Sequence, residues 1–152
     1  MEKRTSKTQI LAAGVKAQES IVNDFRSRIE ELKATGQQYA SEQHDSGAQS
    51  MTEGTEEQAA LMSEQLAMVE EELDKLIRIQ TAEDHDNVHL GSVVVTEQQS
   101  FFVSVSIERF KCEGKEYFGV STKAPIYKAM EGKKKGESFV VNGRSFKILD
   151  LY

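Results

Sequence analysis

The sequence predicts an α+β protein in which an N-terminal antiparallel coiled-coil hairpin of α-helices precedes a small antiparallel β domain with one short helix. Two observations support this class. Through most of the first half of the chain, apolar residues recur in alternating steps of four and three, which is the heptad pattern of paired helices. From Val88 onward they recur at every second position, which is typical of β-strands. We therefore predict a hairpin at residues 1–82 and a β domain at residues 88–152.

The first predicted helix covers residues 5–39 and carries a heptad seam. The seam residues are Leu11, Val15, Gln18, Val22, Phe25, Ile29 and Leu32. Gln18 is a polar residue on this seam. Such a residue often fixes the register of paired helices at some cost in stability.

A polar stretch at residues 41–55 separates the two heptad runs and is predicted to form the tip of the hairpin. The second helix is predicted to begin near Thr55, because Thr55 and Gln58 have the spacing of a capping box. Its seam residues are Met62, Leu66, Val69, Leu73 and Leu76. Two heptad runs joined by a polar loop are expected to pair antiparallel.

The β domain is punctuated by turn signals. Strands are predicted at residues 92–96, 100–107, 115–121, 138–141 and 144–151. Asn142-Gly143 supplies the positive φ angles of a tight hairpin turn. A short helix is predicted at residues 124–130, with Pro125 in its first turn, and an exposed loop of three lysines follows it.

Composition excludes several classes of protein. The formal charge of −6 argues against nonspecific binding to a nucleic-acid backbone, and we expect no sequence-specific nucleic-acid binding. No apolar run approaches the roughly 20 residues that cross a bilayer. Cys112 is the single cysteine, so a reducing compartment fits. We expect a cytoplasmic monomer that does not associate with membranes, although self-association through the heptads stays open.

Three local features have an ordinary explanation and a functional one. The tip half of the hairpin is acidic, which suits either a partner or simply solvated helix faces. Residues 81–87 contain Asp84, His85 and Asp86, but their spacing matches no established metal site, so a hydrated linker is favoured. Cys112 is interpreted as a passive residue at a strand end, because no histidine in its sequence context supports a nucleophile.

The C-terminal part resembles the C-terminal domain of the bacterial Gre transcript-cleavage factors. The first strand contributes LGSVVV at residues 90–95, and the last contributes FKILDL at residues 146–151. The most specific segment is VSTKAPIYKAMEGKKKGE at residues 120–137. A long helical hairpin before this domain strengthens the resemblance, which covers the first half of the chain by architecture only.

The resemblance implies a β domain like that of the FK506-binding proteins, which docks on the rim of RNA polymerase. It implies that the hairpin enters the secondary channel of the polymerase. In the family, two acids at the tip help to hold a second Mg²⁺ shared with the polymerase active site, so that the polymerase cuts a backtracked transcript. A two-metal site of this kind stabilises attacking and leaving oxygens together.

The tip departs from the family pattern, which reads Gly-Asp-Leu-Ser-Glu-Asn. This chain has no such string, so the catalytic acids do not carry over, and the candidates by chemistry and location are Asp45, Glu42 and Glu53. Of these, Asp45 is the candidate metal ligand. For contacts with the polymerase we select Lys123, Tyr127, Lys133, Lys134 and Lys135.

The sequence thus favours a regulator of transcription elongation that is an accessory factor and not an enzyme. Because the paired-acid motif is missing, a hairpin that occupies the channel without supporting cleavage is favoured, and cleavage that uses Asp45 with Glu42 or Glu53 stays open. Two alternatives remain. One is a coiled-coil adaptor that binds another protein. The other is a prolyl isomerase, suggested only by the analogy of fold, which does not carry function.

Overall fold

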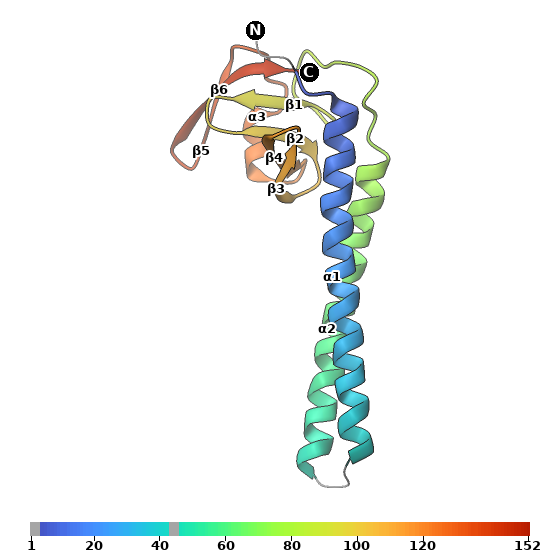
Figure 1. Ribbon diagram of the computed structural model, residues 1–152. Helices are drawn as coiled ribbons and strands as arrows, with labels where there is room; N and C mark the ends of the chain where they lie inside the picture. The colour runs from blue at the N-terminus through green and yellow to red at the C-terminus, as the bar shows by residue number, and fades with distance from the viewer. Residues whose placement is uncertain (1–3, 43–45) are drawn as a thin grey trace. The chain divides into compact units, whose positions relative to one another are not determined.

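The predicted α+β class is confirmed by a computed structural model that describes the backbone of residues 4–42 and 46–152 and the side chains of residues 4–36 and 54–152 (Figure 1). Two long helices come first, α1 (Lys7–Glu42) and α2 (Ser46–Ile77). They are followed by β1 (Val93–Thr96), β2 (Ser100–Ser104), β3 (Ile107–Cys112), β4 (Lys115–Ser121), α3 (Pro125–Met130), β5 (Ser138–Val141) and β6 (Arg144–Leu151). None of the described helices combines the length and apolarity that a bilayer-spanning segment needs.

The chain divides into two compact units. We call Gln18–Glu72 the hairpin unit, and Met1–Ala17 together with Leu73–Tyr152 the sheet unit. The start of α1 and the end of α2 therefore belong to the sheet unit.

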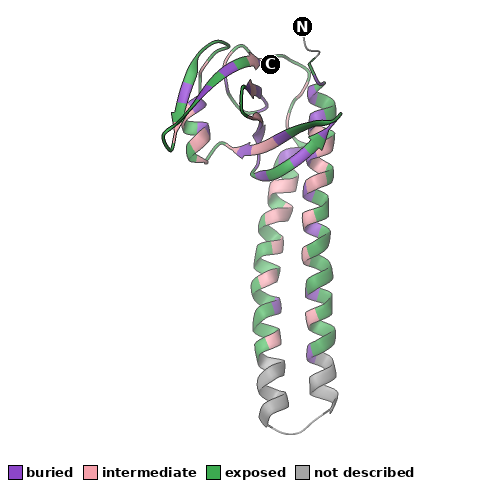
Figure 2. Ribbon diagram, turned by 60° about the vertical axis from the view of Figure 1, so that its left-hand side comes forward, coloured by how far each residue is buried: buried purple, intermediate pink, exposed green. Residues whose placement is uncertain are grey.

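In the hairpin unit, α1 and α2 pack side by side along the predicted seam (Figures 1 and 2). Val22, Ile29 and Ala59 are each at most 6% exposed. The seam continues past the predicted Leu32 to Gly36, where an added Cβ would lie 3.6 Å from Cγ2 of Thr55. The heptad spacing thus identified the packed face of both helices.

Helix α2 begins at Ser46, well before the predicted start near Thr55. Gly47 and Gly54 suggested a loop, because each glycine costs a helix about 1 kcal/mol relative to alanine. The residues between them, AQSMTE, include several good helix formers. Since propagation adds one hydrogen bond for each residue fixed, a long helix can absorb two glycines.

Gln18 lies at the predicted polar position of the seam and is 1% exposed. Its Nε2 donates to the carbonyl oxygen of Val69 at 3.0 Å. Among the described residues, its Oε1 has no hydrogen-bond partner. A buried acceptor left in this way costs about 1–3 kcal/mol.

Replacing Gln18 with a methionine of similar size is therefore expected to stabilise the hairpin unit. The substitution Gln18→Met removes the buried acceptor and forfeits one hydrogen bond, so we expect the free energy of unfolding to rise by about 1 kcal/mol. Urea unfolding followed by helical circular dichroism measures it. The control is Gln65→Met on the exposed face of α2, which should change stability by less than about 0.5 kcal/mol. A Gln18→Met protein no more stable than the wild type would contradict the expectation.

The strands of the sheet unit form a single sheet in the order β3-β4-β2-β1-β6-β5. Its pairs are antiparallel except that β2 and β4 run parallel, so the predicted antiparallel domain is correct for most of the sheet. The single strand predicted at residues 100–107 is wrong, because β2 ends at Ser104 and β3 begins at Ile107. Strand β4 lies between them, and a period of two cannot reveal such a break.

Both faces of the sheet carry a core. Phe101 and Phe102 are neighbours on β2, so their side chains point to opposite faces. Phe101 packs in a cluster with Met130 of α3. Phe102, fully buried, packs in a second cluster with Ile10 of α1 and with other residues that include Leu76, Tyr117 and Tyr152. The sheet is thus covered by α3 on one face and by the helix ends of the same unit on the other.

Candidate functional site

The three candidate tip acids lie where the structure gives least detail. Glu42 is the last residue of α1, and Glu53 lies in α2, but neither side chain is among those described. Asp45 lies outside the described residues. A role for these acids stays a prediction from the sequence.

The segment that carries the resemblance begins with a turn between β4 and α3. Ser121 accepts the backbone N–H of Lys123 through Oγ at 3.1 Å, and its carbonyl oxygen accepts the N–H of Ala124. Ala124 is extended, with φ −72° and ψ 145°, as expected before a proline. Pro125 then starts α3 where its missing N–H costs nothing. The Lys123 side chain is exposed at this turn.

Tyr127 differs from the other selected contact residues, because it is only 7% exposed. Its ring belongs to the core cluster beneath α3, and burial raises the pKa of its hydroxyl. Little of this side chain is left to contact a partner, so we leave Tyr127 out of the docking surface.

The three selected lysines form a loop that is tied down by its backbone. The carbonyl oxygen of Lys133 accepts the N–H of Val88 at 2.9 Å, and Glu137 Oε1 accepts the N–H of Lys134 at 3.1 Å. Lys134 and Lys135 are exposed, whereas Lys133 is half-buried. The hydrogen-bonded backbone of the loop therefore holds two exposed cationic side chains, Lys134 and Lys135.

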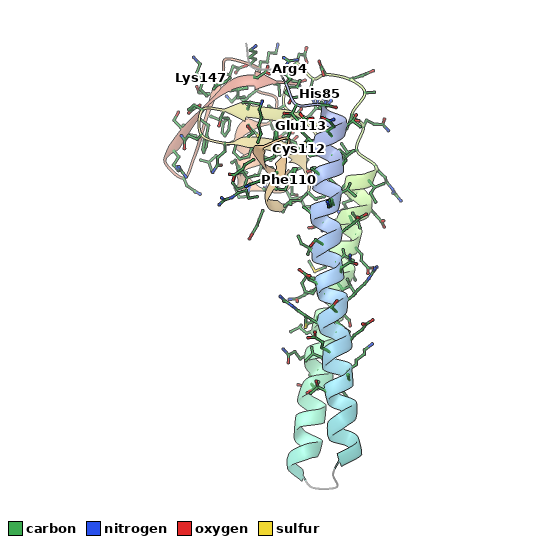
Figure 3. The ribbon with its side chains drawn as sticks, in the orientation of Figure 1. Arg4, His85, Phe110, Cys112, Glu113 and Lys147 are labelled. Carbon is green, nitrogen blue, oxygen red and sulfur yellow. The ribbon has the colours of Figure 1, made fainter. Side chains whose placement is uncertain are left out.

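A polar cluster that the sequence does not predict joins Arg4, near the start of the chain, to β6. Arg4 donates to both carboxylate oxygens of Asp150, at 2.8 Å each. Its guanidinium also lies over the ring of Tyr152, 4.9 Å from the ring centre (Figure 3 labels Arg4). Burial alone would raise the pKa of Asp150, but hydrogen bonds from Arg4 and from the Leu151 N–H lower it. Nothing in the local sequence indicates a pair so distant in the chain.

The linker between α2 and β1 is ordered around two stacked imidazoles. The rings of His85 and His89 lie 3.6 Å apart between centres. His85 Nδ1 is 2.7 Å from Ser92 Oγ, and the Nζ of the buried Lys7 donates to the carbonyl oxygen of Glu83 (Figure 3 labels His85). Burial, helped by Lys7 and His89, lowers the pKa of His85 to about 4. Within the described chain, no group of three or more His, Cys, Asp or Glu could hold a metal ion.

The low pKa of His85 predicts a loss of stability in mild acid. The fold favours the neutral imidazole, so this contribution is fully present above the unfolded pKa near 6.5 and is lost as the pH falls toward about 4. We expect the free energy of unfolding to decrease across this window, and the decrease to be shallower in His85→Gln. Urea unfolding at several pH values measures both slopes. Equal slopes in the two proteins would contradict the assignment to His85.

Cys112 offers no nucleophilic site. Its side chain is 7% exposed, and burial raises the pKa of the thiol. Both features keep the thiol protonated and shielded, in contrast to the exposed thiolate of a reactive cysteine.

The chain has structural neighbours among solved proteins, but no family model or curated sequence matches it. Among solved structures, the chain is similar to GreA factor homolog 1 (Gfh1) of Thermus thermophilus, with 20% sequence identity and a TM-score of 0.37 over 92% of this chain and 95% of that one.

Proposed function

We propose that this protein binds RNA polymerase through its β domain and inserts the helical hairpin into the secondary channel, modulating transcription without supporting transcript cleavage. The observation that carries the proposal is the segment at residues 120–137, which resembles the Gre factors. This segment forms the end of β4, α3 and the lysine loop; Val120, Tyr127 and Met130 belong to the core, and its lysines lie on the outside.

The polymerase contacts are proposed to come from the exposed lysines of this element. Lys123 and Lys134 are exposed toward its two ends, and neither side chain forms an ion pair with a described residue. Lys133 and Lys135 add positive charge to the same loop. A cationic surface of this kind is suited to a complementary acidic patch, which accelerates association.

Binding to purified RNA polymerase tests this proposal. We expect the protein to be retained by immobilised polymerase, and an authentic Gre factor to displace it. The double variant Lys123→Glu/Lys134→Glu should weaken retention by about tenfold or more. Lys111→Glu places a charge reversal on edge strand β3 and should bind normally. Failure of the folded wild-type protein to bind the polymerase would refute the proposal.

The second half of the proposal concerns the tip. The missing family string argues for occupation of the channel without cleavage, because a second metal needs oxygen ligands at defined positions. A cleavage assay on stalled elongation complexes is expected to show no stimulation. Stimulation that disappears in Asp45→Ala or Glu42→Ala would show that the tip supports cleavage.

A second candidate function, a coiled-coil adaptor, is favoured by one observation. Leu61 and Met68 lie seven residues apart on α2 and are 59% and 65% exposed. A spacing of seven places both on one stripe of the helix, where another helix could pack. If Leu61→Glu/Met68→Glu abolished a stable complex with a partner other than the polymerase, the adaptor function would replace the first.

A further inference from the structure

A broad hollow lies in the sheet unit, away from the lysine turn at Lys123. Its volume is about 1080 Å³, larger than most sites for small molecules. Its lining comes from residues 4 and 5, the β1–β2 turn, the β3–β4 hairpin, the loop between α3 and β5, and the end of β6. We call it the trough.

The trough is basic in a protein that is acidic overall. Four cationic side chains line it, against two carboxylates: Arg4, Arg109, Lys115 and Lys135 against Glu116 and Asp150. The lining therefore has a formal charge of +2, whereas the chain has −6. A concave surface with a net positive charge attracts ligands of negative charge.

Two ion pairs in the trough are long, and each has a solvent-exposed cation. Arg109 lies 3.7 Å from Glu116, with side chains 62% and 45% exposed. Lys135 lies 3.7 Å from Asp150. Long pairs with an exposed cation contribute little to stability, so Arg109 (62% exposed) and Lys135 (63% exposed) can bind an incoming carboxylate at small cost. Arg4, with its two short bonds to Asp150, is the fixed part of the wall.

The trough also offers apolar surface between its charges. Leu149 is 47% exposed and Val95 is half-buried, and both line it. Gln98 and Gln99 supply polar groups at the rim. A ligand that fits must therefore combine negative charge with aliphatic groups.

The aromatic residues of the trough argue against a nucleic acid. Single strands gain affinity by stacking bases on exposed rings. Of the three aromatic residues in the lining, Tyr117 and Tyr152 are only 2% and 4% exposed, Phe118 is half-buried, and Arg4 already covers the ring of Tyr152. The phosphates of a nucleic acid could bind the cations of the trough, but its bases would have few exposed rings on which to stack.

We propose that the trough is a docking site for an acidic peptide segment of a partner protein, with its carboxylates at Arg109 and Lys135 and an aliphatic side chain against Leu149. Lys123 and Lys134, whose double variant tests the polymerase surface, do not line the trough, whereas Lys135 belongs both to the lysine loop and to the trough.

Fluorescence anisotropy with a labelled peptide of Glu-Glu-Leu repeats tests the site on the full chain. We expect saturable binding that weakens as salt is raised. Arg109→Glu/Lys135→Glu reverses the formal charge of the trough and should weaken binding by about tenfold or more. Leu149→Ser should weaken it less, because it removes one aliphatic contact. The matched control is Lys16→Glu/Lys111→Glu, which makes the same change in charge at exposed positions outside the trough and should bind normally.

Two further probes separate the alternatives. A Lys-Lys-Leu peptide should not bind, and single-stranded oligothymidylate should bind more weakly than the acidic peptide. The proposal is overturned if the acidic peptide fails to bind, if both double variants bind it equally, or if oligothymidylate binds more tightly. Circular dichroism of every variant establishes that a loss of binding is not a loss of fold. None of these outcomes depends on whether RNA polymerase is bound.

Discussion

Gly119→Ala is expected to destabilise the sheet unit by about 3 kcal/mol, the upper end of the usual cost of overpacking. Gly119 lies in β4, opposite Phe102 of β2 and Ile107 of β3. An added Cβ would collide with the carbonyl oxygen of Val105 and would lie 2.8 Å from Cβ of Ile107. Both obstacles belong to backbone or to atoms next to it, so no side-chain rotation relieves them.

Thermal unfolding monitored by the near-ultraviolet signal of the tyrosines measures this effect, because every tyrosine except Tyr39 lies in the sheet unit. The control is Gly54→Ala in α2, where an added Cβ has nothing within 4 Å among the described atoms. That substitution should stabilise the protein by about 0.5–1 kcal/mol, since alanine favours helix. A Gly119→Ala protein as stable as the wild type would mean that β3 and β4 are spaced more widely than described.

Tyr152→Ala should cost about 3–5 kcal/mol, as for other large buried aromatic residues. The Tyr152 side chain is 4% exposed and packs with Phe102 and Ile10. Its hydroxyl donates to the carbonyl oxygen of Thr5 at 2.7 Å, and its backbone pairs with Val93. The substitution removes the packing and the hydroxyl bond together.

Tyr152→Phe separates these two contributions. It keeps the ring and removes only the hydroxyl, so it should cost about 1 kcal/mol. Urea unfolding of both variants gives the ratio. If Tyr152→Phe cost as much as Tyr152→Ala, the hydroxyl bond and not the packing would hold the start of the chain to the sheet.

The seam of the hairpin was predictable because it is a local pattern. Val22, Ile29 and even the polar Gln18 occupy the buried positions that the heptad spacing assigns to them. The start of α2 was not predictable from the sequence. Gly47 and Gly54 lower the local helix propensity, but a long helix can include both.

The order of the strands in the sheet could not be predicted from the sequence, for a different reason. Alternation shows which residues face the same side of a strand, but not which strand lies beside it. The insertion of β4 between β2 and β3 depends on Gly119, whose missing side chain lets the backbone at Val105 approach. The sequence shows that residue 119 is a glycine, but not that the backbone of Val105 lies against it.

The candidate sites divide in the same way. The exposure of Lys123 and Lys134 was predictable because a charged residue next to a turn is usually exposed, whereas their role in binding stays a prediction. Tyr127 was misplaced because α3 has only six residues, too few to show which face is apolar. The Arg4–Asp150 pair spans 146 positions, and no local pattern contains that information.

That span has a consequence for how the chain folds. The contacts of the hairpin unit join residues of one continuous segment, Gln18–Glu72. The sheet unit is completed only when Thr5 meets Tyr152, 147 positions later in the chain. Closing so long a loop adds little to the free-energy cost of folding. It slows folding, because the favourable contacts of the sheet unit form only after the loop has closed. During synthesis the hairpin unit can therefore fold first, whereas the residues around Thr5 can pack against the sheet only after β6 has been made.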